Sequence, residues 1–151
     1  MLPFEGERMF ALPPDQVWPK LRDMAFLATS IPDATPKGAA TRDRATATVQ
    51  PGFSFMRGSL EITAEIIDAQ EPTTVQYRLT SKGIGSSSVV ETALTLLPHE
   101  QGTKVQYRAE VTSLTGLLKM VPAGLIRGAA QKVIEDVWTG VAAKIVSANQ
   151  P

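Results

Sequence analysis

Cysteine is absent from the 151 residues, and histidine occurs once. Without cysteine the chain has no disulfide, no thiol catalysis and no thiolate metal site. One histidine is too few for the usual zinc ligand sets, and the carboxylates show no recognisable ligand spacing. We expect His99, in the turn-forming stretch from Pro98 to Gly102, to be an exposed loop side chain. The sequence therefore predicts no metal centre, and it offers no residue that we would assign as catalytic.

The chain also lacks an excess of one charge and a long apolar run. Fifteen basic and 15 acidic side chains cancel, which excludes the basic footprint of a nucleic-acid-binding protein. A membrane span needs about 18 consecutive apolar residues, but Lys119 and Pro122 interrupt the most apolar stretch. The opening residues include Glu5 and Glu7 and lack the basic-then-apolar order of a signal peptide. We expect a cytoplasmic protein, and peripheral contact with the inner face of the membrane stays open.

Length and composition predict one domain over residues 1–151. Hydrophobic residues make up 43% of the chain and charged residues 20%, which are values close to globular averages. No internal repeat, low-complexity segment or linker divides the sequence. A chain of this length can bury a full hydrophobic core.

The order of the predicted elements is strand, helices, strands, helix. Residues 4–12 read as a strand, and the prolines that follow start a region of helical spacing over 14–31, as one helix or two. Residues 35–115 read as a meander of strands separated by Pro- and Gly-rich turns. Apolar residues alternate with polar ones from Leu60 to Ile66 and from Val105 to Val111, so one face of the sheet must be covered.

A long C-terminal helix supplies the cover. Apolar side chains recur every four residues along it, at Val121, Leu125, Ala129, Val133, Val137, Val141 and Ile145. The pattern predicts a helix about 35–40 Å long. Its glycines, Gly124, Gly128 and Gly140, either leave space or allow close approach to the sheet. We therefore predict an α+β fold: a curved antiparallel sheet of about six or seven strands, two short helices after the first strand, and a long C-terminal helix that encloses an apolar cavity.

Several motifs resemble one family. The run VWPKLRDMAFLATSIPDA over 17–34 resembles VW-x-x-L-x-D-x-x-x-L-A-x-x-IP-G-A, which opens the CoxG-like proteins, a family named for a carbon monoxide dehydrogenase component. The segments 58–72 and 102–107 resemble that family's glycine-led strand and its GT-x-V-x-Y strand. Two features depart from the pattern: Asp33 replaces a glycine, and three serines at 86–88 replace a glycine- and alanine-rich approach. The family belongs to the START-like helix-grip (SRPBCC) superfamily of hydrophobic-ligand binders.

The resemblance implies a non-catalytic binder or carrier of an apolar small molecule, quinone-like or lipid-like, with no other cofactor. It also implies service to a molybdenum hydroxylase complex of the carbon-monoxide-dehydrogenase type. Two alternatives remain open: an enzyme of the superfamily such as a polyketide cyclase, aromatase or hydratase, or an assembly factor that acts through its surface. A buried carboxylate or Arg78 in the pocket would favour the enzyme. A cavity well below ~300 Å³ would count against a carrier.

Ten residues are expected to converge on the enclosed space. They are Phe26, Leu27, Ile31, Ile62, Tyr77, Leu79, Tyr107, Val121, Leu125 and Ile126. The two tyrosines lie on the inward phase of their strands, and a buried phenol needs a hydrogen-bond partner, so either could orient a ligand carbonyl.

Other side chains receive structural interpretations. The strand carboxylates share a phase with polar residues and are expected to face water; they are Glu61, Glu65, Glu91 and Glu110. Arg78 and Arg108 follow the same phase, although either could sit at a cavity rim. Phe53, Phe55 and Met56 are expected to pack inward or to form a cavity lip.

Overall fold

The computed structural model describes residues 2–31, 33–50, 58–83 and 85–148 of the chain. It contains one antiparallel sheet of seven strands in the order β1-β7-β6-β5-β4-β3-β2. The strands are β1 (Leu2–Phe10), β2 (Thr35–Pro36), β3 (Arg44–Val49), β4 (Leu60–Gln70), β5 (Thr74–Gly83), β6 (Ser86–His99) and β7 (Gly102–Gly116). The helices are α1 (Pro14–Leu21), α2 (Met24–Thr29), the 3₁₀ turn η1 (Leu117–Met120) and α3 (Ala123–Ala148).

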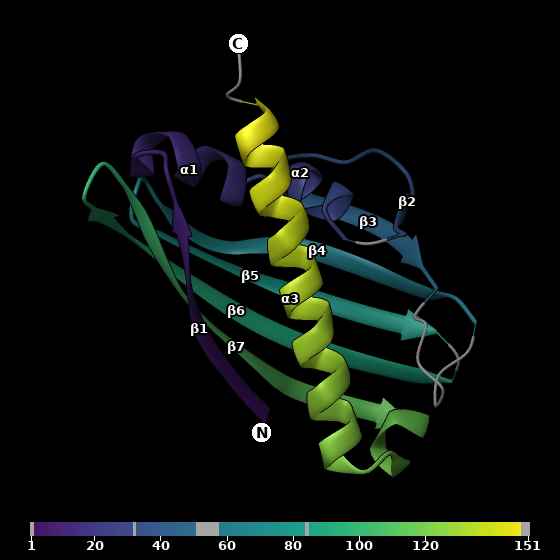
Figure 1. Cartoon of the computed structure of the whole chain (residues 1–151). Coiled ribbons are helices and arrows are strands. Elements are labelled where there is room, and N and C mark those ends of the chain that lie inside the picture. The colour runs from purple at the N-terminus through teal and green to yellow at the C-terminus, as the bar shows by residue number, and fades with distance from the viewer. Residues whose placement is uncertain (1, 32, 51–57, 84, 149–151) are drawn as a thin grey trace.

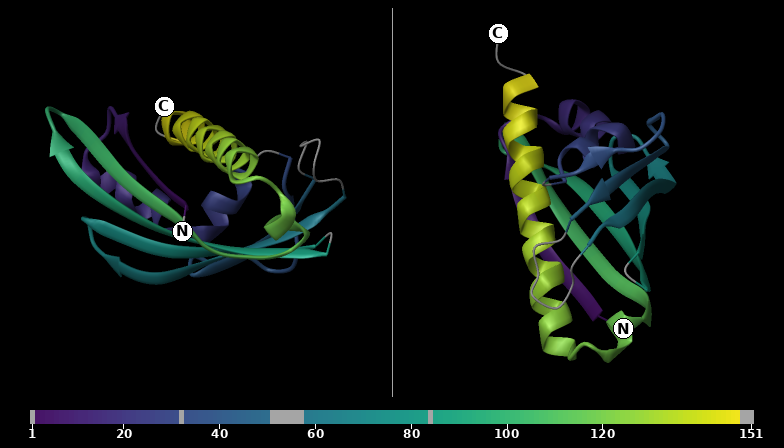
Figure 2. Two further views of the ribbon diagram at one scale, coloured as in Figure 1. Left: turned by 90° about the horizontal axis from the view of Figure 1, so that it is seen from below. Right: turned by 90° about the vertical axis from the view of Figure 1, so that its right-hand side faces the viewer.

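The sheet curves around α3, which crosses its concave face (Figures 1 and 2). The short helices α1 and α2 close the space between the sheet and the C-terminal half of α3 (Figure 1). This architecture confirms the predicted α+β helix-grip fold, with two short helices directly after the first strand. Within the described residues, no helix is both long enough and apolar enough to cross a membrane.

Local sequence signals explain where the helices begin. Pro14 occupies the first turn of α1, where its missing N–H costs nothing. The Asp23 side chain caps α2 by accepting hydrogen bonds from the backbone N–H groups of Ala25 and Phe26, at 3.0 and 3.3 Å. Pro122 directly precedes α3, so it adds no kink to the helix interior.

The two halves of α3 pack differently. In the C-terminal half, Trp138, Val141 and Ile145 are buried in the main core, together with apolar residues of α1, α2 and the sheet. In the N-terminal half, from 123 to 133, Ile126 alone is buried; it belongs to a smaller cluster with Leu60 and Leu118. The helix is therefore anchored firmly at one end and lightly at the other.

The glycines of α3 follow the same division. A Cβ atom added at Gly140 would lie 2.8 Å from the carbonyl oxygen of Ser30, at the end of α2. At Gly124 and Gly128 an added Cβ would meet nothing within 4 Å. Both interpretations left open by the sequence therefore occur: close approach at Gly140 and open space at the other two positions.

The predicted buried stripe of α3 was wrong in part. Leu125 is 53% exposed and Val133 is 40% exposed, although both belong to the four-residue series. A helix has 3.6 residues per turn, so each step of four residues advances about 40° beyond a full turn. Over the length of α3 the series drifts around the helix and leaves the covered face.

Candidate ligand-binding cavity

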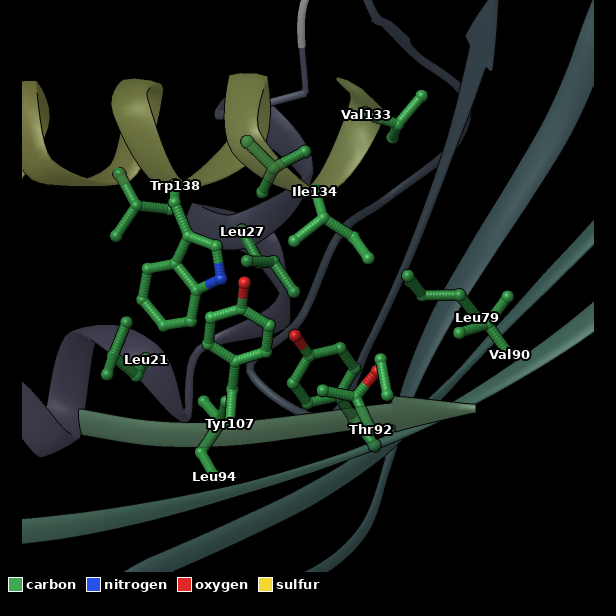
Figure 3. A pocket seen from close by; sticks show the side chains of 14 residues that line it. Leu21, Leu27, Leu79, Val90, Thr92, Leu94, Tyr107, Val133, Ile134 and Trp138 are labelled. Carbon is green, nitrogen blue, oxygen red and sulfur yellow. The ribbon is translucent and has the colours of Figure 1, made fainter. Parts of the chain in front are cut away.

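Two apolar chambers lie between α3 and the concave face of the sheet. The inner chamber, of about 80 Å³, is lined by residues of α1, α2, β5, β6, β7 and the C-terminal half of α3. Its labelled residues in Figure 3 are Leu21, Leu27, Leu79, Val90, Thr92, Leu94, Tyr107, Val133, Ile134 and Trp138. The outer chamber, of about 210 Å³, lies beside the N-terminal half of α3 and η1, with Leu118, Ile126, Ala129 and Ala130 in its lining.

The chambers share a wall of four side chains. Leu79, Val90, Val133 and Ile134 line both. The shared residues present apolar side chains, and Val133 is 40% exposed, so this wall reaches the surface at α3. Rotation of these side chains would join the two spaces without moving a strand.

The linings are uncharged. In the described part of the chain, neither chamber is lined by an acidic, basic or histidine side chain. Polar side-chain atoms reach the inner lining from Tyr77, Thr92, Tyr107 and Trp138. In the outer lining, the hydroxyl groups of Ser81 and Ser88 hydrogen-bond each other. The site can therefore hold an apolar molecule but offers no acid–base pair of its own.

Tyr77 is the buried phenol of the inner chamber. Burial raises its pKa from 10.0 to about 12, and a hydrogen bond with the Thr92 side chain partly offsets this rise. Both residues lie on the inward phase of adjacent strands, where Tyr77 and Thr92 are paired in register. Tyr77 therefore stays neutral at any physiological pH.

This raised pKa gives a stability prediction. The folded protein holds the Tyr77 proton more tightly than the unfolded chain does, so the contribution is intact below pH 10 and is lost as pH rises towards 12. We expect the free energy of unfolding to fall over this range by about 2–3 kcal/mol more in wild type than in Tyr77→Phe. Urea denaturation at several alkaline pH values measures the difference, and parallel pH profiles for the two proteins would contradict it.

Tyr107 lies at the β1 side of the inner chamber. Its ring covers Gly6 on the adjacent strand β1, where an added Cβ would come within 2.8 Å of the ring and hydroxyl. Trp138 packs on it with ring centroids 5.5 Å apart, and the Arg8 guanidinium lies 5.5 Å from the ring centroid. Glycine at position 6 is what allows the phenol this position.

The structure brings six of the ten predicted residues to a chamber wall. Leu27, Tyr77, Leu79 and Tyr107 line the inner chamber, and Ile62, Leu79 and Ile126 line the outer one. The other four lie elsewhere: Phe26 packs on the main core beneath Lys20 and Lys144, Ile31 and Val121 pack on the smaller cluster, and Leu125 is exposed. Leu125 leaves the lining because of the helical drift described above.

Sequence reasoning missed several lining residues. Trp138 is the main one, and its spacing of three and seven residues from Val141 and Ile145 was the available signal. Val90, Thr92 and Leu94 were also missed, although they alternate along β6 as an inward face does. A polar threonine at an inward position marks the partner that a buried tyrosine requires.

The charged side chains keep to the outside, as expected. Arg78 and Glu91 form an ion pair at 3.3 Å on the opposite face of the sheet. Glu61 pairs with Lys37, which lowers the pKa of the Glu61 carboxyl. His99 is exposed at the end of β6. The predicted positions of Phe53, Phe55 and Met56 lie outside the described residues.

Solved structures share this fold over nearly their whole length. A conserved protein from Geobacillus kaustophilus matches with a TM-score of 0.83 and 19% identity, over 97% of each chain. A protein from Mycobacterium smegmatis matches with a TM-score of 0.70 and 18% identity, over 98% of this chain and 93% of that one. A protein from Chromobacterium violaceum gives a TM-score of 0.69 and 14% identity, over 95% and 96%. At these identities the likeness establishes the fold.

The sequence itself identifies the family. No curated protein gave a significant match to the chain. The model of the CoxG family, which is named for a subunit of carbon monoxide dehydrogenase, matches residues 6–146. This match covers both the sheet and most of α3, and it agrees with the resemblance seen in the motifs. The chain therefore belongs to the CoxG family of carbon monoxide dehydrogenase subunits.

Proposed function

We propose that this protein binds and carries an apolar small molecule, quinone-like or lipid-like, between α3 and the sheet. The observation that carries the proposal is the pair of adjoining chambers with uncharged, largely apolar walls. Each chamber alone is smaller than the ~300 Å³ of a typical ligand site. A ligand of useful size therefore spans both, with the shared wall of Leu79, Val90, Val133 and Ile134 displaced around it.

The lining favours binding over catalysis. A cyclase or hydratase of this superfamily would need an inward-facing acid or base in the pocket. Arg78, the residue that would have favoured an enzyme, pairs with Glu91 on the other face of the sheet. The hydroxyls of Tyr77 and Tyr107 can orient a ligand, but a phenol with a pKa raised to about 12, as in Tyr77, is a poor proton donor at neutral pH.

The family suggests the partner. It is named for a subunit of carbon monoxide dehydrogenase, and we propose that the bound molecule serves a molybdenum hydroxylase complex of that type. A carrier of this kind would exchange its ligand between the complex and an apolar reservoir. On this proposal the protein works on the cytoplasmic side of a membrane, which is the natural reservoir for such molecules.

A corner of the molecule suits peripheral contact with that membrane. Leu117, Met120 and Leu125 are 58%, 81% and 53% exposed and lie at η1 and the start of α3. Between them, Leu118 and Ile126 point inward to line the outer chamber. This apolar corner therefore adjoins the space into which we propose that the ligand passes.

The charge around the corner has one sign. From residue 111 to 134 the chain carries Lys119, Arg127 and Lys132 and no acidic residue. Basic residues near an anionic lipid surface each contribute about 1 kcal/mol to binding. The combination of exposed apolar side chains and basic neighbours favours an anionic bilayer over a neutral one.

Vesicle binding tests the corner. We expect the protein to co-sediment with vesicles of phosphatidylglycerol and phosphatidylethanolamine, and the double variant Leu117→Glu/Met120→Glu to bind at least ~10-fold more weakly, because two inserted apolar side chains are lost. Leu97→Glu, at another exposed apolar position, is the control and should bind as wild type does. Equal binding of all three proteins would remove the corner from the proposal.

The carrier proposal itself is tested with a fluorescent apolar probe. Titration with N-phenyl-1-naphthylamine should give saturable binding of one molecule per chain, and the probe should be displaced by a short-chain quinone or a fatty-acid ester. Displacement identifies the occupied space as the ligand site. A protein that leaves the probe's fluorescence unchanged at micromolar concentrations would speak for the assembly-factor alternative.

A further inference from the structure

We propose that Tyr107 and Trp138 together form a hydrogen-bonding pole in the inner chamber, which receives the carbonyl oxygen of a neutral apolar ligand. This inference rests on the proposed function and adds the chemical class of the ligand and its orientation. The carbonyl end would lie in the inner chamber, and the apolar remainder would run through the shared wall into the outer chamber.

The two polar groups come from opposite sides of the cavity. Tyr107 rises from β7, and Trp138 descends from the anchored half of α3. Their rings are 5.5 Å apart between centroids with a tilt of 33°. Figure 3 shows the Tyr107 hydroxyl reaching the level of the Trp138 indole nitrogen, with the nitrogen turned towards the cavity. A single ligand atom can therefore approach both.

Neither group has a hydrogen-bond partner within the described residues. The contrast with similar groups is clear: Trp18 Nε1 donates to the carbonyl oxygen of Thr74 at 3.0 Å, and the Tyr77 phenol bonds with Thr92. In the described part of the chain, no polar side-chain atom that is sealed from solvent lacks a partner. The Tyr107 hydroxyl and Trp138 Nε1 are therefore not sealed, and each retains an N–H or O–H available to an incoming acceptor.

The donor types define the ligand. Trp138 Nε1 can only donate, so the ligand atom must be an acceptor, and a carbonyl oxygen has two lone pairs for two donors. A carboxylate is disfavoured, because no cationic side chain lines the inner chamber among the residues described and a buried unpaired charge is costly. The nearest cation, Arg8, stacks on the outer side of this group and donates to the backbone carbonyl oxygen of Glu7.

Two carbonyl sources share this chemistry, a quinone ring and an acyl chain, and matched probes separate them. Menadione and 2-methylnaphthalene share a methylated two-ring skeleton and differ in the ring carbonyls. The chain ketone 2-undecanone and undecane differ only in one carbonyl. Affinities are measured by displacement of N-phenyl-1-naphthylamine from wild type, Tyr107→Phe and Trp138→Phe. The hydrocarbon in each pair reports whether a variant still folds around its cavity.

We expect each substitution to weaken carbonyl binding by about 2- to 10-fold, the value of one hydrogen bond, in at least one probe pair. The matched hydrocarbon should change by less than about twofold for Tyr107→Phe, which keeps the ring over Gly6. Tyr77→Phe is the control: the same atom is removed in the same chamber, but from a phenol already bonded to Thr92. It should show no selective loss. The pair with the larger effect identifies a ring or a chain carbonyl.

Two outcomes overturn the inference in different ways. If ketone and hydrocarbon both bind and both variants change them equally, the polar pole is wrong while the carrier function stands. If no probe of either kind binds, the carrier function fails and the pole fails with it. If Trp138→Phe does not fold, Tyr107→Phe decides alone.

Discussion

Ala130→Trp should abolish the binding of an apolar ligand while leaving the protein folded. Ala130 faces the outer chamber from α3 and contributes one of its smallest lining side chains. An indole at this position would fill much of the 210 Å³ that a ligand needs. Because the added ring enters existing space, it gains apolar contact rather than displacing packed atoms.

The expected readout is the affinity for N-phenyl-1-naphthylamine together with the melting temperature. We expect affinity to fall at least ~10-fold, which corresponds to about 1.4 kcal/mol or more, with no loss of thermal stability. Gln131→Trp adds the same ring at the next position of α3, where the side chain is exposed, and should bind as wild type does. Undiminished probe binding by Ala130→Trp would place the ligand outside these chambers.

Gly140→Val should destabilise the protein strongly. The first added carbon would lie 2.8 Å from the backbone carbonyl oxygen of Ser30, and backbone at the end of α2 cannot yield as a flexible side chain can. Either α3 lifts from the core around Val141 or α2 shifts. Overpacking of this kind costs about 1–3 kcal/mol or more, which lowers the melting temperature by about 2–4 °C per kcal/mol in a domain of this size.

The same substitution on the lightly packed half of α3 is the control. Gly128→Val adds its side chain where nothing lies within 4 Å. We expect it to be neutral or to stabilise by a few tenths of a kcal/mol, because valine has a better helix propensity than glycine. Equal effects at the two positions would mean that the two halves of α3 are anchored alike.

The fold was predictable because its signals are local. Alternation over Leu60–Ile66 and Val105–Val111 set the inward faces of two strands, and the prolines at 13 and 14 marked the start of the first helix. The motif over 17–34 then supplied the family, and the family supplied the arrangement of these elements. Each of these signals depends on residues close together in the sequence.

The lining of the site was less predictable because it depends on the phase of one long helix. The apolar series at every fourth residue pointed to Leu125 as a lining residue, and it is exposed; Trp138 was overlooked, and it is buried. Over 26 residues a small error in period turns the predicted face well away from the real one. The division of the cavity into two chambers depends on side-chain packing at Leu79, Val90 and Ile134, which no local pattern encodes.

Native mass spectrometry of the freshly purified protein tests the central claim most directly. The account is that apolar space between α3 and the sheet holds a carbonyl-bearing apolar molecule. We expect a species heavier than the bare chain, and organic extraction should yield a quinone or lipid in a ratio near one per chain, which Ala130→Trp should lack. A chain that carries no adduct, and still takes up neither quinone nor lipid when these are supplied, would contradict the account.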